Sequence, residues 1–156
     1  MKRIMSFLWS VMISFFFIAP VYAYEPVSTG FWNNTAIGGH DTLAYYEKGL
    51  VGSTAVAKGQ KAYTVVWQGA DWRFASQASA DKFRANPEGY VPRYNGHCAN
   101  ALSLGEGLIP TDGSVWEFFG DELYLFYAER GRQRWLNGDW QQYQIEADLA
   151  WKSELQ

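Results

Sequence analysis

The fold is decided by residues 63–74, YTVVWQGADWRF. Residues 63–67 are β-branched or aromatic, and such residues favour strands because they pack well on a pleated surface. The same bias resumes at 72–74, and the four residues between, 68–71, contain the glycine and aspartate typical of a turn. The stretch therefore predicts a β-hairpin.

A helix is predicted immediately after this hairpin, over about 78–85. Ser76 or Ser79 can accept a backbone N–H at the start of such a helix. Asn86-Pro87 ends it, because a residue before proline is pushed out of the helical region.

A second unit of the same kind follows towards the C-terminus. Strands are predicted at 115–118 and 123–126 around a Gly120-Asp121 turn, then a helix over 128–136. The two units share a pattern but few letters, so either a duplication or two independent hairpin–helix units explains them. A last helix is predicted from Asp139, as its cap, to about residue 153. Together these elements predict an α+β domain with a small, mostly antiparallel sheet built from β-hairpins and packed helices.

The first 23 residues have the pattern of a secretory signal peptide. Lys2 and Arg3 precede an apolar run over about 4–18, and Ala23 supplies the small residue at a cleavage site. The run is short for a membrane span, so we expect no stable span after cleavage. An uncleaved anchor helix is the alternative.

Cleavage after Ala23 leaves one domain, residues 36–156, preceded by an irregular arm, residues 24–35, that Phe31 and Trp32 are expected to attach to the body. Loss of the two basic residues of the signal leaves 11 basic against 16 acidic residues, a net charge of about −5. Nucleic-acid binding needs clustered Lys and Arg to neutralise phosphates, so a nucleic-acid partner is not expected.

The chemistry of the chain is concentrated around its single cysteine, in Asn95-Gly96-His97-Cys98. Asn-Gly indicates a turn, and the small residues after Cys98 predict one or two helical turns ending at Gly105. A thiol at a helix N-terminus has its thiolate favoured by the helix dipole. Since a lone cysteine cannot form an internal disulfide, Cys98 is buried, metal-bound, reactive, or paired with another chain.

The second histidine, His40, lies in a similar setting, Gly38-Gly39-His40-Asp41, followed by Tyr45. Asp41 has an independent explanation as the N-cap of a short helix over about 42–46. If the fold brings this turn to the turn before Cys98, one site would collect imidazole, carboxylate, phenol and thiol.

Four segments resemble one protein family when taken in order: AIGGHDTLAYY at 36–46, WRFAS at 72–76, FRANPEGY at 83–90 and YNGHCA at 94–99. They resemble the exported bacterial proteins that carry a YHS domain. The resemblance implies a compact α+β domain, a periplasmic location, and kinship with metal-binding modules of the YHS and TRASH type. We therefore expect an accessory protein that binds a metal or a small ligand.

The resemblance also implies a set of site residues, with two departures. In exported members tyrosine commonly stands where His40 and His97 stand here, and the cysteine pattern differs. The metal-binding relatives usually have cysteines before the first strand and a Phe-Cys-Ser step after the hairpin, whereas this chain has Phe74-Ala75-Ser76 and no early cysteine. Imidazole with thiolate favours copper, zinc or nickel. The predicted metal ligands are Cys98, Asp41 and His40, and the predicted contacts to a bound cofactor or ligand are Tyr45 and His97.

Two other classes of function stay open from the sequence. The chain has 8 Trp and 10 Tyr, and exposed rings among them could bind a non-metal small molecule or a protein partner, with Cys98 serving as core packing. A thiol-dependent enzyme is the third hypothesis. The sequence contains no Gly-x-Ser-x-Gly, phosphate-loop, His-Glu-x-x-His or Cys-x-x-Cys motif, which favours a binding role over catalysis.

Overall fold

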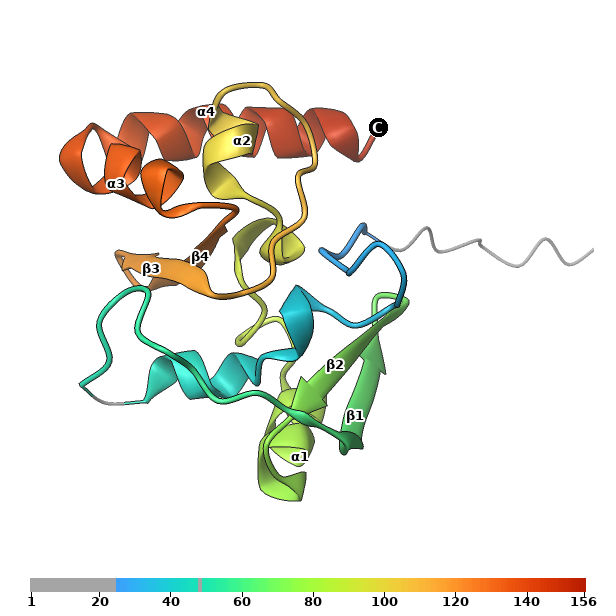
Figure 1. Ribbon diagram of the computed structural model, residues 1–156. Coiled ribbons are helices and arrows are strands. Elements are labelled where there is room, and N and C mark those ends of the chain that lie inside the picture. Colours follow the sequence, from blue (N-terminus) through green and yellow to red (C-terminus); the bar gives the residue numbers. More distant parts are fainter. Residues whose placement is uncertain (1–24, 48) are drawn as a thin grey trace, which may run out of the picture.

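The structure is a computed structural model that describes residues 25–47 and 49–156 (Figure 1). The predicted signal peptide lies outside the described residues. The elements, in chain order, are the 3₁₀ helices η1 (Ile37–Gly39) and η2 (Thr42–Tyr46), β1 (Gln60–Trp67), β2 (Ala70–Phe74), α1 (Gln77–Ala85), η3 (Arg93–Gly96), α2 (Ala99–Ser103), β3 (Val115–Phe119), β4 (Glu122–Phe126), α3 (Glu129–Asn137) and α4 (Trp140–Glu154).

The first hairpin pairs β1 with β2 in antiparallel register, with Val65 opposite Trp72. Its turn is tighter than the sequence predicts. Gln68 and Gly69 both have positive φ, 47° and 72°, as in the two-residue turns that match the twist of paired strands. The second strand therefore resumes at Ala70, within the four residues predicted as a turn.

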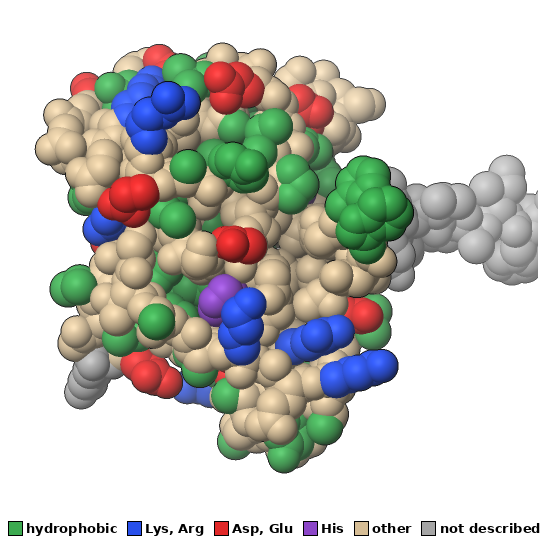
Figure 2. All heavy atoms as spheres, in the orientation of Figure 1, with side chains coloured by type: hydrophobic (Ala, Val, Ile, Leu, Met, Phe, Trp, Pro, Cys, Tyr) green, Lys and Arg blue, Asp and Glu red, His purple; other side chains and the backbone are tan. Residues whose placement is uncertain are grey.

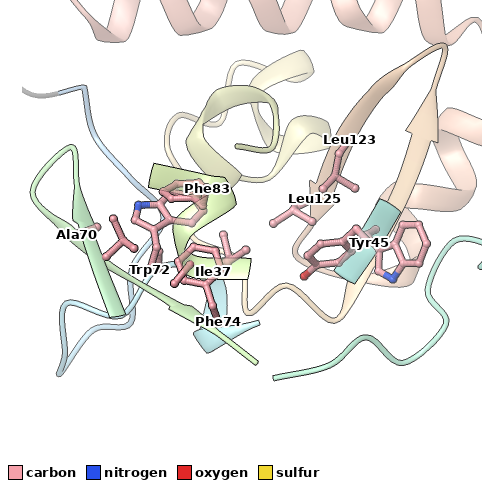
Figure 3. Close-up of a cluster of buried hydrophobic side chains, with 12 residues drawn as sticks. Ile37, Tyr45, Ala70, Trp72, Phe74, Phe83, Leu123 and Leu125 are labelled. Atoms are coloured by element: carbon pink, nitrogen blue, oxygen red, sulfur yellow. The ribbon is translucent and has the colours of Figure 1, made fainter. Parts of the chain in front are cut away.

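One cluster of buried side chains joins the two hairpin–helix halves of the chain (Figure 3). Trp72 and Phe74 of β2 pack against Phe83 of α1 on one side, with ring centroids 5.3 and 5.0 Å from that of Phe83. Leu125 of β4 and Tyr45 of η2 lie on the other side. Full burial of one large apolar side chain is worth about 1.5–3 kcal/mol, so this cluster is a main source of stability.

A second cluster lies between the second hairpin and the last two helices. Trp135 of α3 is fully buried, and its ring lies 5.2 Å from Tyr124, 5.4 Å from Phe119 and 5.6 Å from Phe126. Figure 1 shows α2, α3 and α4 together on one side of β3 and β4, with α1 at the opposite end of the molecule beside β1 and β2.

The hairpin–helix arrangement occurs twice, and the second strand and the helix of the two units are separated by the same number of residues. The second strand of the hairpin begins at residue 70 in one half and 122 in the other, and the following helix begins at 77 and at 129, each 52 residues later. Each hairpin is preceded by a left-handed turn and a short helix. The described part of the chain thus repeats one structural unit, as the shared sequence pattern suggested.

The N-terminal arm is attached by a different residue from those predicted. Phe31 and Trp32 are about 90% exposed, so they do not attach the arm to the body. Ser28 is fully buried instead, and Thr29 forms an antiparallel bridge with Ala36. The prediction failed because aromatic character alone does not reveal which way a loop residue points.

The predicted α+β class is confirmed by four α-helices and two antiparallel hairpins among the described residues. The hairpins form two separate two-stranded sheets. No helix within 25–47 or 49–156 is long and apolar enough to cross a membrane.

Candidate functional site

Two short turns carry the candidate site, and both run through the left-handed region of backbone conformation. Residues 37–39 have φ of 42°, 63° and 78°, and residues 94–96 have φ of 56°, 50° and 82°. This conformation costs a non-glycine residue about 1–2 kcal/mol. Ile37 and Tyr94 adopt it while buried, so the surrounding structure must hold both turns in place.

Each turn ends in a buried histidine with the same hydrogen bond. His40 Nδ1 lies 3.2 Å from the carbonyl oxygen of Ile37, and His97 Nδ1 lies 3.0 Å from that of Tyr94. A carbonyl only accepts, so Nδ1 carries the proton of each neutral ring. Burial lowers the pKa of both histidines below the ordinary value, more than the hydrogen bonds raise it. Both rings are therefore neutral at neutral pH.

Asp41, which follows the first histidine, is engaged by backbone N–H groups on both carboxylate oxygens. Oδ1 accepts from Leu43 at 3.0 Å, which confirms the predicted cap of η2. Oδ2 accepts from Ala75, one residue beyond β2, at 2.9 Å. The side chain is 2% exposed. Its carboxylate thus fastens the short helix to the end of the hairpin.

Cys98, which follows the second histidine, holds the equivalent position. Its N–H donates to Ile109 at 2.8 Å, as that of Asp41 donates to Ala57 at 2.9 Å. Its Sγ accepts the N–H of Tyr127, one residue beyond β4, at 3.3 Å. Thiol and carboxylate thus both accept an N–H from just beyond a hairpin, although Cys98 makes no side-chain cap to α2 as Asp41 does to η2.

The predicted metal ligands do not form one three-donor group. Across 25–47 and 49–156, no three His, Cys, Asp or Glu side chains lie where they could hold a metal ion together. Asp41 accepts backbone N–H groups in the first half of the fold, and Cys98 accepts one in the second half. The arrangement does not fit an ion held jointly by His40, Asp41 and Cys98.

The two turns nevertheless meet, through residues that the sequence did not single out. Ser28 lies between them: its N–H donates to Asn95 at 3.0 Å and its carbonyl accepts from Ile37 at 2.8 Å. Its hydroxyl also accepts from the N–H of Thr111 at 2.8 Å, and the Thr111 hydroxyl donates to Gly96 at 2.7 Å. These contacts join positions up to 83 residues apart, which local sequence patterns cannot reveal.

Gly113 lies against the first turn. A Cβ there would come within 2.7–2.8 Å of the Ile37 carbonyl, the Tyr45 hydroxyl and His40 Nδ1. The Tyr45 hydroxyl donates to the carbonyl of Gly113 at 2.7 Å, and its ring lies 6.2 Å from that of His40. Tyr45 and His40 are therefore neighbours, as the composite site required, although both serve the packing of this loop.

A groove of about 570 Å³ opens beside this meeting point. We call it the junction groove. Phe31 and Tyr127, which line it, are 89% and 70% exposed. Figure 2 shows hydrophobic groups on one face of the molecule, with an acidic group and a histidine near its centre. The residues that line the junction groove include Thr29, Phe31, Gly38, Thr111, Asp112 and Tyr127.

Comparison with known protein families gives one finding. Residues 51–94 match the family model of the YHS domain. This segment of the chain is similar to a YHS domain. Comparison with curated proteins and with solved structures gave no match.

The match confirms the resemblance to a YHS domain and limits it to these residues. It spans the first hairpin and α1 and ends within η3. All five predicted site residues lie outside it, on the turns that precede the two hairpins. The repeated unit in the C-terminal half also lies beyond the matched residues. The assignment of ligands to these turns stays a prediction.

Proposed function

We propose that this protein is a binding module that holds a small organic ligand in the junction groove, with Cys98 serving as packing and as a backbone acceptor. The observation that carries the proposal is the groove itself, in which two highly exposed rings flank the point where both turns meet. Exposed aromatic side chains beside a hollow are typical of surfaces that receive an apolar partner.

The size and framework of the groove favour a small molecule over a protein. Ligand pockets commonly enclose about 300–1,000 Å³, whereas a stable protein interface buries about 800 Å² per partner. The walls are held by hydrogen bonds: Thr111 to Ser28 and Gly96, and Tyr127 to Cys98. Such a site loses little conformational entropy when a ligand binds.

The geometry disfavours a thiol-dependent reaction. A nucleophilic cysteine needs a base within hydrogen-bond reach. The Cys98 thiol contacts the Tyr127 N–H, whereas His40 Nδ1 contacts the Ile37 carbonyl. The metal hypothesis, which the YHS resemblance supports, is the second candidate and makes an opposite prediction for Cys98.

Thermal melts of three proteins separate the candidates. Indole at ten times its dissociation constant should stabilise the wild type by about 1.4 kcal/mol, by mass action. Cys98→Ser should melt earlier without ligand, because a hydroxyl replaces a buried thiol, but should respond to indole equally. Tyr127→Ala should respond less.

Chelator, Zn²⁺ and Cu²⁺ complete the comparison. A metal-induced rise in melting temperature that Cys98→Ser abolishes would favour the metal hypothesis. A rise with indole that Tyr127→Ala leaves unchanged would place indole outside the groove.

The proposal includes export to the periplasm, which rests on the basic start, the apolar run and Ala23. Sequencing the N-terminus of the purified protein should find Tyr24. An intact Met1 on protein from the membrane fraction would contradict the placement.

A further inference from the structure

The charge in the junction groove is carried by a single acidic side chain. Among the described residues that line it, Asp112 is the charged one. Its Oδ1 accepts from the N–H of Ser114 at 2.9 Å and from the Ser114 hydroxyl at 2.5 Å. Both bonds end on one oxygen, which orients the carboxylate, and among the described residues no hydrogen bond ends on its other oxygen.

Asp112 is ionised at neutral pH. Partial burial raises its pKa, but the two Ser114 hydrogen bonds and the nearby His40 and Lys58 lower it by more. The pKa of Asp112 therefore lies below its ordinary value. Lys58 lies close enough to act on Asp112, and its ammonium donates to the Gly38 carbonyl at 3.3 Å. It is not among the residues that line the groove.

The two exposed rings, Phe31 and Tyr127, also favour a positively charged ligand. The face of an aromatic ring attracts a cation through its quadrupole, by about 0.5–2 kcal/mol depending on desolvation. The backbone of Tyr127 is held by its N–H bond to Cys98, and Phe31 belongs to a turn closed by the N–H of Asn33 on the Gly30 carbonyl at 3.3 Å. An anion would instead meet the Asp112 carboxylate.

Taking the proposed binding function as given, we propose that the ligand of the junction groove is an organic cation: an ammonium group beside Asp112, attached to an apolar body that packs on Phe31 and Tyr127. The net charge of the chain, −3, acts in the same direction at longer range.

Three matched probes test the sign of the charge. Benzylammonium, benzyl alcohol and benzoate share one ring and differ in the charge of the substituent. Each is titrated into the protein at low ionic strength, with amide shifts of Thr29, Gly38 and Asp112 reporting the groove. Benzylammonium should bind about fivefold more tightly than benzyl alcohol, as expected for a cation–π contact plus one exposed ion pair. Benzoate should bind most weakly.

Two variants assign the preference to one residue. Asp112→Asn keeps the Oδ1 acceptor for Ser114, so the loop should fold unchanged while the advantage of benzylammonium falls to the part that the rings of Phe31 and Tyr127 supply, and benzyl alcohol binds as before. Asp121→Asn, at an exposed acid in the β3–β4 turn, is the control and should behave as the wild type.

The failures of the two proposals are distinguishable. Equal affinities for the three probes, or an ammonium preference that Asp112→Asn leaves undiminished or that Asp121→Asn lowers as much, would overturn the inference on charge. Absence of groove shifts with all three probes would overturn the proposed binding function itself.

Discussion

Gly38→Ala should lower the free energy of unfolding by about 3 kcal/mol or more, from the left-handed conformation and from overpacking together. Gly38 has φ of 63°, and a Cβ there would overlap the backbone carbonyl of Asp112. A backbone carbonyl cannot rotate away as a flexible side chain can. Urea unfolding of both proteins measures the loss.

Gly120→Ala is the matched control for this experiment. Gly120 also has φ of 63°, but a Cβ there would meet nothing within 4 Å. It should therefore cost only the conformational part, about 1 kcal/mol. Similar losses in the two variants would show that the close approach of Gly38 and Asp112 does not join the halves of the fold.

The elements of this fold were predictable where their causes are local. Strand-forming residues located both hairpins, and the caps at Asp41, Ser76 and Asp139 are all present as side-chain acceptors. The strand β1 begins earlier than predicted, at Gln60, because pairing with Phe74 across an irregularity in register extends it. Because that pairing depends on the opposite strand, the polar residues at the start of β1 carry little local signal for it.

Only separate parts of the site could be predicted from the sequence. The sequence pointed to the turns before His40 and His97, and both proved to be left-handed turns with a buried histidine. It could not show that Asp41 and Cys98 each accept an N–H from beyond a hairpin, because those contacts span 34 and 29 residues. The same separation hid the contribution of Ser28 to the junction.

The equivalence of Asp41 and Cys98 has an energetic consequence. A thiol accepts weakly and fills space as a small hydrophobe, whereas a carboxylate accepts two strong hydrogen bonds. The first half therefore depends on hydrogen bonding at this position more than the second half does. A substitution that removes only the acceptor should reveal the difference.

Asp41→Ala should destabilise the protein by about 2–4 kcal/mol, because it leaves the N–H groups of Leu43 and Ala75 without their acceptor, at about 1–3 kcal/mol for each buried group. The stability of Asp41→Asn should fall between those of the wild type and Asp41→Ala. Its side-chain oxygen can still accept from Leu43, but its NH₂ group faces the Ala75 N–H. The measurement is the midpoint and slope of urea unfolding, with the slope checking that the compactness of the two states is unchanged.

Asp139→Ala provides the control for a cap that is exposed. Asp139 also accepts an N–H through Oδ1, from Gln142 at 3.1 Å, but water can replace it at the start of α4. The expected cost is about 1 kcal/mol. If Asp41→Ala costs no more than Asp139→Ala, the carboxylate does not fasten η2 to the first hairpin, and Asp41 would again be available as a ligand.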